Sequence, residues 1–237
     1  MEVHHHGHHE GKKTWKSYIR EFLMLFFAVF CGFLAEWRLE VMIENHREDE
    51  YIHSIVEDIS ADVKQTENLQ IDLRNRITLI NALLKEITSK NIQENSNKAN
   101  KLWLSTLGFP DFVQNDRTIQ QLKSSGSLRI IRNKKVSDKI MEYDQTVRLL
   151  YITQTNMNTI ASNNTLYGQF FDLIKLQNEN SIAIPITENG KNLLNEAYSS
   201  RFFWRINLLS LNKRLITLNK KGKEVREIIT EEYKLRK

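Results

Sequence analysis

The chain has 237 residues and a formal net charge of +5, with only two prolines and eight glycines. A chain this long can bury a sizeable core, and so few helix-breaking residues favour long helices. Charges alternate in sign along most of the chain and form no single cationic face, which argues against a nucleic-acid partner. Cys31 is the only cysteine, so the chain cannot form an internal disulfide.

Five of the seven histidines lie within the first ten residues. They are His4, His5, His6, His8 and His9. Imidazole nitrogens bind transition metals, so these side chains are candidate ligands. The alternatives are the remnant of an affinity tag and a hydrophilic tail ahead of an anchor. Because Gly7 interrupts the run, we interpret residues 1–14 as a native cytoplasmic tail, and we expect no metal and no cofactor.

The stretch from Phe22 to Ala35 is the only run that is apolar on every side and carries no charge. Its length as a helix is roughly 21 Å, shorter than the roughly 30 Å hydrocarbon core of a bilayer. The rings of Trp15 and Trp37 extend it to roughly 33 Å, and such rings are typical of the membrane interface. We therefore predict a transmembrane anchor at residues 15–38.

The residues around this run argue against a cleaved signal peptide, which is the main alternative. Cleavage needs small residues at −3 and −1, whereas a site after Ala35 or Gly32 places Phe33 or Phe30 at −3. The segment is therefore predicted to be permanent.

Basic residues predict the orientation, since short basic flanks remain in the cytoplasm. Four basic residues precede the apolar run, namely Lys12, Lys13, Lys16 and Arg20. In residues 36–50, which follow the run, the only basic residues are Arg38 and Arg47. The N-terminus should therefore be cytoplasmic and residues 39–237 extracytoplasmic, which fits a single-pass protein of the bacterial inner membrane.

One face of the anchor combines small and acidic residues. Glu21, Ala28, Gly32 and Glu36 are separated by seven, four and four positions. A small-x-x-x-small pair lets another helix approach closely within lipid. This face is either a docking stripe for a second copy or another membrane protein, or the ordinary use of Gly and Ala in membrane helices.

After Trp37 no glycine or proline occurs before Gly108. Apolar residues recur at helical spacing from Ile52 to Ile87, which predicts a helix of roughly fifty residues. The regular stripe favours the inner face of a bundle, with a parallel coiled coil between two copies as the alternative.

Two further long helices are expected, one from Ser127 and one from Asn192 to about Tyr233. Between the first long helix and the one that begins at Ser127, the Asn- and Ser-rich residues 89–100 predict a turn. Short helices are expected at 98–107 and in a segment that ends at Lys123. The fold class is therefore all-α, with one N-terminal transmembrane helix continuing into an antiparallel bundle of three long helices plus short ones.

Three large rings follow one another at Phe202, Phe203 and Trp204, flanked by arginines. Adjacent helical positions point about 100° apart, so the three rings cannot all enter one core. Phe203 and Trp204 are thus candidates for a partner interface, and a second aromatic core layer is the alternative.

Residue patterns typical of catalysis are missing from the sequence, which has no phosphate-binding loop, HExxH, CxxC or GxSxG motif. Glu57, Asp58 and Asp62 are interpreted as the solvated face of the first long helix, as are His46 and His53. We therefore expect that the protein is not an enzyme.

Two segments carry a resemblance, GFLAEWRLEVMIENHREDEYIHSIVEDI at residues 32–59 and TIQQLKSSGSLRIIRNKKVSDKIMEY at 118–143. The chain resembles uncharacterised bacterial single-pass membrane proteins that have an exported helical domain and a Leu-x-x-Ser-Gly-x-Leu turn. Leu122, Ser125, Gly126 and Leu128 match that turn. The resemblance implies a membrane-attached helical domain of unknown function and carries over no catalytic residue.

The predicted function is structural. The chain should present its bundle to another envelope or membrane component, with the lipid bilayer and either a membrane or envelope protein or a second copy as partners. The alternative is an extracytoplasmic domain that senses a ligand.

Overall fold

The structure is a computed structural model that describes residues 14–162, 166–173 and 186–235. Within those ranges the chain is almost entirely helical, and its one β-type contact is an isolated bridge between Phe171 and Ile186. The predicted all-α class is confirmed.

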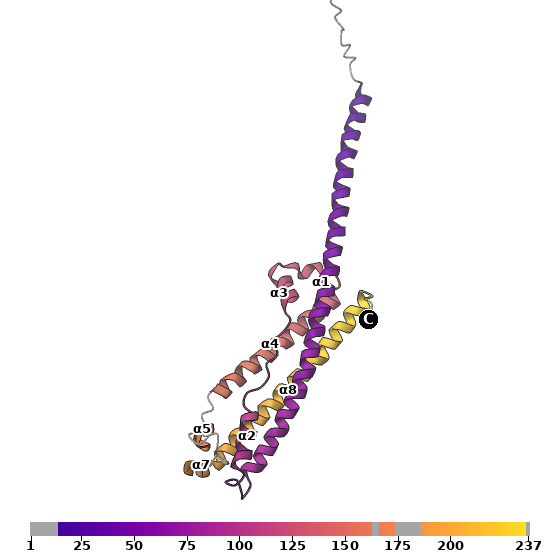
Figure 1. Ribbon diagram of the computed structural model, residues 1–237. Coiled ribbons are helices and arrows are strands. Elements are labelled where there is room, and N and C mark those ends of the chain that lie inside the picture. The colour runs from indigo at the N-terminus through magenta and orange to yellow at the C-terminus, as the bar shows by residue number, and fades with distance from the viewer. Residues whose placement is uncertain (1–13, 163–165, 174–185, 236–237) are drawn as a thin grey trace, which may run out of the picture. The chain divides into compact units, whose positions relative to one another are not determined.

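The three long helices expected from the sequence are α1, α4 and α8 (Figure 1). In chain order, the described elements are α1 (Trp15–Ile87), α2 (Ser96–Ser105), α3 (Arg117–Ser124), the 3-10 helix η1 (Ser127–Ile130), α4 (Lys134–Ser162), α5 (Leu166–Phe170), α7 (Glu188–Asn192) and α8 (Leu194–Glu232).

The chain divides into two compact units, the first ending at Glu50 and the second beginning at Tyr51. In its described part, the first unit consists of the N-terminal portion of α1. Hydropathy alone suggested a boundary at 38/39. By their contacts, residues 39–50 belong to the first unit.

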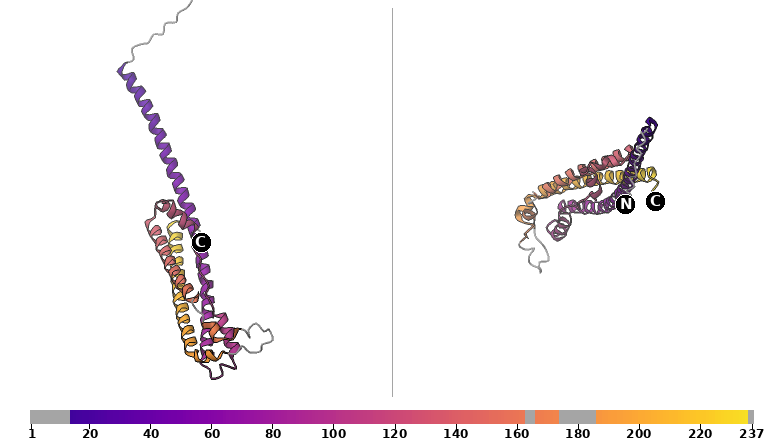
Figure 2. Two further views of the ribbon diagram at one scale, coloured as in Figure 1. Left: turned by 90° about the vertical axis from the view of Figure 1, so that its left-hand side faces the viewer. Right: turned by 90° about the horizontal axis from the view of Figure 1, so that it is seen from above.

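Within the second unit, α8 runs antiparallel to α4. Lys135 Nζ lies 2.8 Å from Glu232 Oε1, whereas Lys139 Nζ lies 2.9 Å from Glu224 Oε1, so rising numbers in α4 meet falling numbers in α8. Two views show α8 running opposite to both α4 and residues 51–87 of α1 (Figures 1 and 2). The two antiparallel seams agree with the predicted bundle.

A connector, residues 106–116 between α2 and α3, is held by side chains of two different helices. Extended backbone points successive N–H groups to opposite sides, and those of residues 112–115 donate alternately to α4 and α1. The acceptors are, in order, Gln154 Oε1 (3.3 Å), Gln65 Oε1 (3.1 Å), Tyr151 Oη (2.8 Å) and Asp62 Oδ1 (2.8 Å). The connector therefore lies between α1 and α4 without any strand partner.

This connector makes α1 and α4 parallel to one another. Arg76 of α1 donates to the carbonyl of Leu107, and Thr118 Oγ1 donates to Asp58 of α1, so the connector runs back along α1 before α4 begins. The sequence did not predict this return because an extended segment of eleven residues has no helical period.

The main core is built from the apolar faces of the three long helices and from the connector. Ile59 and Val63 of α1, Tyr143 of α4 and Leu218 of α8 are among its buried members. The predicted stripe of α1 faces this core, including its one polar member, Thr66, whose hydroxyl donates to Val63 O. The bundle reading of the stripe is thus confirmed.

At Gly222, α8 packs tightly against side chains of α1 and α4. A Cβ built on this glycine would lie 2.7 Å from Val63 Cγ2, 3.3 Å from Tyr143 Cε2 and 3.4 Å from Ile59 Cγ2. A side chain of any kind would therefore have to displace β-branched or aromatic neighbours.

A second, smaller core is aromatic. Trp103 of α2 lies 5.4 Å from Phe170 and 5.7 Å from Phe171, measured between ring centroids. The Tyr167 hydroxyl donates to Asn100 Oδ1 at 2.6 Å, and Leu83 and Ile87 close the cluster from α1. None of Phe202, Phe203 and Trp204 belongs to this core, so it is not the aromatic layer that the sequence suggested for those three rings.

The turn at Ser125 and Gly126 ends α3 as the sequence predicts. Gly126 has a φ of 65°, a left-handed conformation that favours glycine, and Leu122 before it is fully buried.

Candidate functional site

Among the described residues, α1 is the one helix that is long and apolar enough to cross a membrane, and its apolar stretch lies near the N-terminus. None of its most apolar stretch is buried inside the protein. Phe22, Phe26 and Phe30 stack along one side of it, with successive ring centroids 6.2 and 5.9 Å apart. An uncovered apolar surface of this length is stable in lipid or against a partner, but not in water.

The proposed docking stripe lies on one face of this helix. Because α1 is unbroken, the spacing of Glu21, Ala28, Gly32 and Glu36 aligns all four residues. Ala28, Gly32 and Glu36 are exposed and Glu21 is half-buried, and a Cβ added at Gly32 would meet no atom within 4 Å. The face is therefore open, while its use as a docking stripe remains a prediction.

The two aromatic interface candidates on α8 point in different directions. Phe203 is 65% exposed, whereas Trp204 is buried in the main core. The indole Nε1 of Trp204 donates to Thr106 O at 3.1 Å, and its ring lies 6.0 Å from that of Phe109. Trp204 therefore holds the connector, and its candidacy as a surface residue was wrong because its helical position faces inward.

Further apolar side chains accompany Phe203 on the surface of α8. We define the α8 row as Tyr198, Phe202, Phe203, Ile206, Leu209 and Ile216, all of them exposed. Most of them are three, four or seven positions apart, which places them along one side of the helix. Their spacing is visible in the sequence, but α8 is apolar on more than one side, so spacing alone does not show which side is exposed.

The histidine-rich tail, with His4, His5, His6, His8 and His9, lies outside the described residues. In the part of the chain that is described, no group of three or more His, Cys, Asp or Glu side chains could hold a metal ion. His46 instead lies 3.3 Å from Glu50, one turn further along α1.

Asp62 is not on the solvated face to which the sequence assigned it. Its side chain is buried and accepts hydrogen bonds from Asn115 N, Asn115 Nδ2 and Tyr143 Oη, each at 2.8 Å. Burial raises the pKa of this carboxyl, and the three donors oppose that rise. Burial also raises the pKa of the Tyr143 hydroxyl, which remains a neutral donor. Two of the three donors belong to Asn115 of the connector, so the role of Asp62 is to hold the connector against α1.

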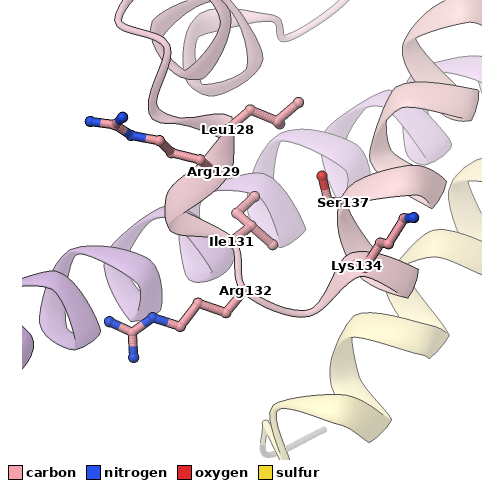
Figure 3. A pocket seen from close by; sticks show the side chains of 6 residues that line it. All are labelled: Leu128, Arg129, Ile131, Arg132, Lys134 and Ser137. Atoms are coloured by element: carbon pink, nitrogen blue, oxygen red, sulfur yellow. The ribbon is translucent and has the colours of Figure 1, made fainter.

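A surface pocket of about 300 Å³ opens where η1 meets α4. It is lined by Leu128, Arg129, Ile131, Arg132, Lys134 and Ser137. Figure 3 shows the guanidinium groups of Arg129 and Arg132 pointing away from Ser137, while Ile131 points towards it. Because the cations diverge, the pocket does not form a converging anion site.

Comparison of the chain with protein-family models, curated proteins and solved structures gives no match. The resemblance to single-pass membrane proteins therefore stays a prediction.

Proposed function

We propose that the chain is a non-enzymatic, single-pass membrane protein that presents its helical unit to another component of the membrane or envelope. The observation that carries this proposal is the fully uncovered apolar stretch of α1, which is followed in the chain by a second unit with a core of its own. An apolar surface outside a packed core needs lipid or protein around it. Lysines and arginines before this stretch favour a cytoplasmic N-terminus and an exported second unit in a bacterial inner membrane.

The first prediction concerns attachment and orientation. In the full chain carrying Cys31→Ala, a cysteine placed at the exposed Lys220 should react with a membrane-impermeant maleimide in intact spheroplasts. A cysteine placed at Lys12, in the predicted cytoplasmic tail, should react only after lysis, because the anchor separates the two positions. Both variants should remain in the membrane pellet after alkaline carbonate extraction. Release into the supernatant would refute the anchor, and the reverse labelling pattern would refute the orientation.

The α8 row is the surface that we propose for partner binding. At roughly 150–250 Å² for a full side chain of this size, its members expose on the order of 500 Å². That is close to the roughly 600–800 Å² that each partner contributes to smaller stable interfaces. The row thus has enough apolar area to contribute most of one side of an interface.

Charge indicates the kind of partner. Between Glu196 and Glu224, α8 contains no acidic residue. Its exposed basic residues in that span include Lys213, Arg214 and Lys220, whereas Arg201 is buried and Lys223 pairs with Glu67 of α1. A second copy would bring the same positive charges opposite themselves, which is unfavourable. The partner surface we propose is therefore an apolar helix face flanked by acidic residues.

A second prediction tests this surface with a synthetic amphipathic peptide that has leucines on one face and glutamates on the flanks. The full chain in mild detergent should bind it, and should bind a peptide with lysine flanks at least tenfold more weakly. Phe203→Glu combined with Leu209→Glu should weaken binding at least tenfold. The matched control is Val113→Glu, which changes an exposed apolar side chain of the connector and should leave binding unchanged.

Two outcomes would contradict this assignment. Equal binding of the two peptides would remove the charge argument. A stable dimer that the same double variant dissociates would replace the acidic partner with a second copy of the chain.

A further inference from the structure

Arg201, near the start of α8, is a buried cation without a carboxylate partner among the described residues. Its side chain is 2% exposed, and its guanidinium carbon lies 4.7 Å from the centroid of the Trp103 ring. One of its terminal nitrogens donates to the neighbouring Ser200 hydroxyl at 3.4 Å, and its Nε has no hydrogen-bond acceptor.

This burial is electrostatically unfavourable in the structure as it stands. Loss of hydration lowers the pKa of Arg201 to about 10, so the group remains protonated at neutral pH. Buried charges are normally paired, and a face contact with one ring replaces only part of the lost hydration. Glu86, which lies between Leu83 and Ile87 of the same aromatic core, is engaged by Lys98. Arg201 therefore has its charge uncompensated.

Other polar groups around Arg201 are also buried without partners. Arg205, one turn further along α8, has a buried Nε with no acceptor. On α2, the indole Nε1 of Trp103, whose ring faces the Arg201 guanidinium, is likewise unsatisfied. Two views show α2 beside the first turns of α8 (Figures 1 and 2).

The unsatisfied groups share one chemical character. The nitrogens of Arg201, Arg205 and Trp103 can only donate. A ligand that satisfies them must bring several acceptor oxygens and negative charge. Guanidinium groups bind phosphate and carboxylate oxygens in pairs, which makes an oxyanion the matching ligand.

We propose that Arg201 and Arg205, together with Trp103, bind the phosphate or carboxylate group of a small soluble anion. The site lies in the second unit and does not depend on how the chain is attached to a membrane. The proposal names a ligand class, small oxyanions, for the alternative function in which the domain senses a ligand.

Tryptophan fluorescence and the thermal unfolding midpoint test the proposal in the full chain, held in mild detergent and exchanged into phosphate-free buffer. Titration with inorganic phosphate or succinate at constant ionic strength should change the fluorescence saturably and raise the midpoint. Chloride should do neither. The absence of a saturable response to both oxyanions would overturn the proposal, as would a response only to added phospholipid.

Variants assign the response to the site. Arg201→Met should weaken binding of inorganic phosphate at least tenfold. Arg205→Met, at a half-buried position that tolerates change more readily, should weaken it severalfold and provides the readout if the first variant does not fold. Arg214→Met removes an exposed cation from the same helix and should leave binding unchanged. An equal loss in Arg214→Met would show that only the general positive charge of α8 attracts anions.

Stability without ligand separates a binding role from a structural one. In phosphate-free buffer, Arg201→Met should unfold at the same temperature as the unmodified chain or at a higher one, because replacing an unpaired buried charge with an apolar side chain is neutral or favourable. A lower midpoint in ligand-free buffer, together with no response of the unmodified chain to anions, would make Arg201 a structural partner of Trp103.

Discussion

Replacing Asp62 with alanine should lower the free energy of unfolding by roughly 3 kcal/mol, a large effect for a single side chain. The substitution removes the acceptor of three hydrogen bonds and leaves the buried Tyr143 hydroxyl and the Asn115 amide without partners. Unfolding of the full chain in mild detergent, followed by circular dichroism, measures the change. Glu57→Ala, at an exposed position of the same helix, should cost less than about 0.5 kcal/mol.

Adding Tyr143→Phe to Asp62→Ala should lower the free energy of unfolding only slightly further, because both members of the buried pair are then absent.

The titration of Asp62 also predicts how the stability of the protein depends on pH. Since the pKa of Asp62 is raised above the ordinary aspartate value of 3.8, the native state holds the proton more tightly than the unfolded chain. Its contribution to stability is complete below that value and is lost as pH rises through the raised pKa. The advantage of the unmodified chain over Asp62→Asn should therefore shrink with rising pH and then level off. An advantage that grows with pH would contradict this.

Gly222→Ala should destabilise the protein by roughly 1–2 kcal/mol, although alanine is the better helix former by about 1 kcal/mol. The sign follows from the close approach of α8 to α1, where the new methyl group would lie 2.7 Å from Val63 Cγ2. Thermal unfolding midpoints of the single variants and of Gly222→Ala with Val63→Ala measure the coupling. The double variant should be more stable than the sum of the two single changes predicts. Stabilisation by Gly222→Ala alone would show that the helices can separate at this point.

Periodicity in the sequence was sufficient to predict the long helices and the inner face of α1, because those features depend on spacing of three and four residues. It did not predict the burial of Asp62, since a single aspartate beside Asp58 looks like part of a solvated face until the connector is placed over it. The same limit applies to Arg201. Its flanking aromatic residues marked the region as unusual, but only the fold brings the guanidinium over Trp103 of α2.

Helical spacing alone does not predict which of the adjacent rings Phe203 and Trp204 is buried. Helical geometry predicts that the two rings diverge, and the structure assigns Phe203 to solvent and Trp204 to the core. Which of them turns inward depends on Thr106 and Phe109, which belong to a segment without periodic pattern.

The alternating hydrogen bonds of the connector have a mechanical consequence. Sliding α1 past α4 by one helical turn, about 5.4 Å, would break the hydrogen bonds that Asp62 and Gln65 accept from the connector, together with the one that Asp58 accepts from Thr118 in α3. The connector therefore holds residues 51–87 of α1 in register with α4, and any axial displacement of one helix against the other has to break several hydrogen bonds at once.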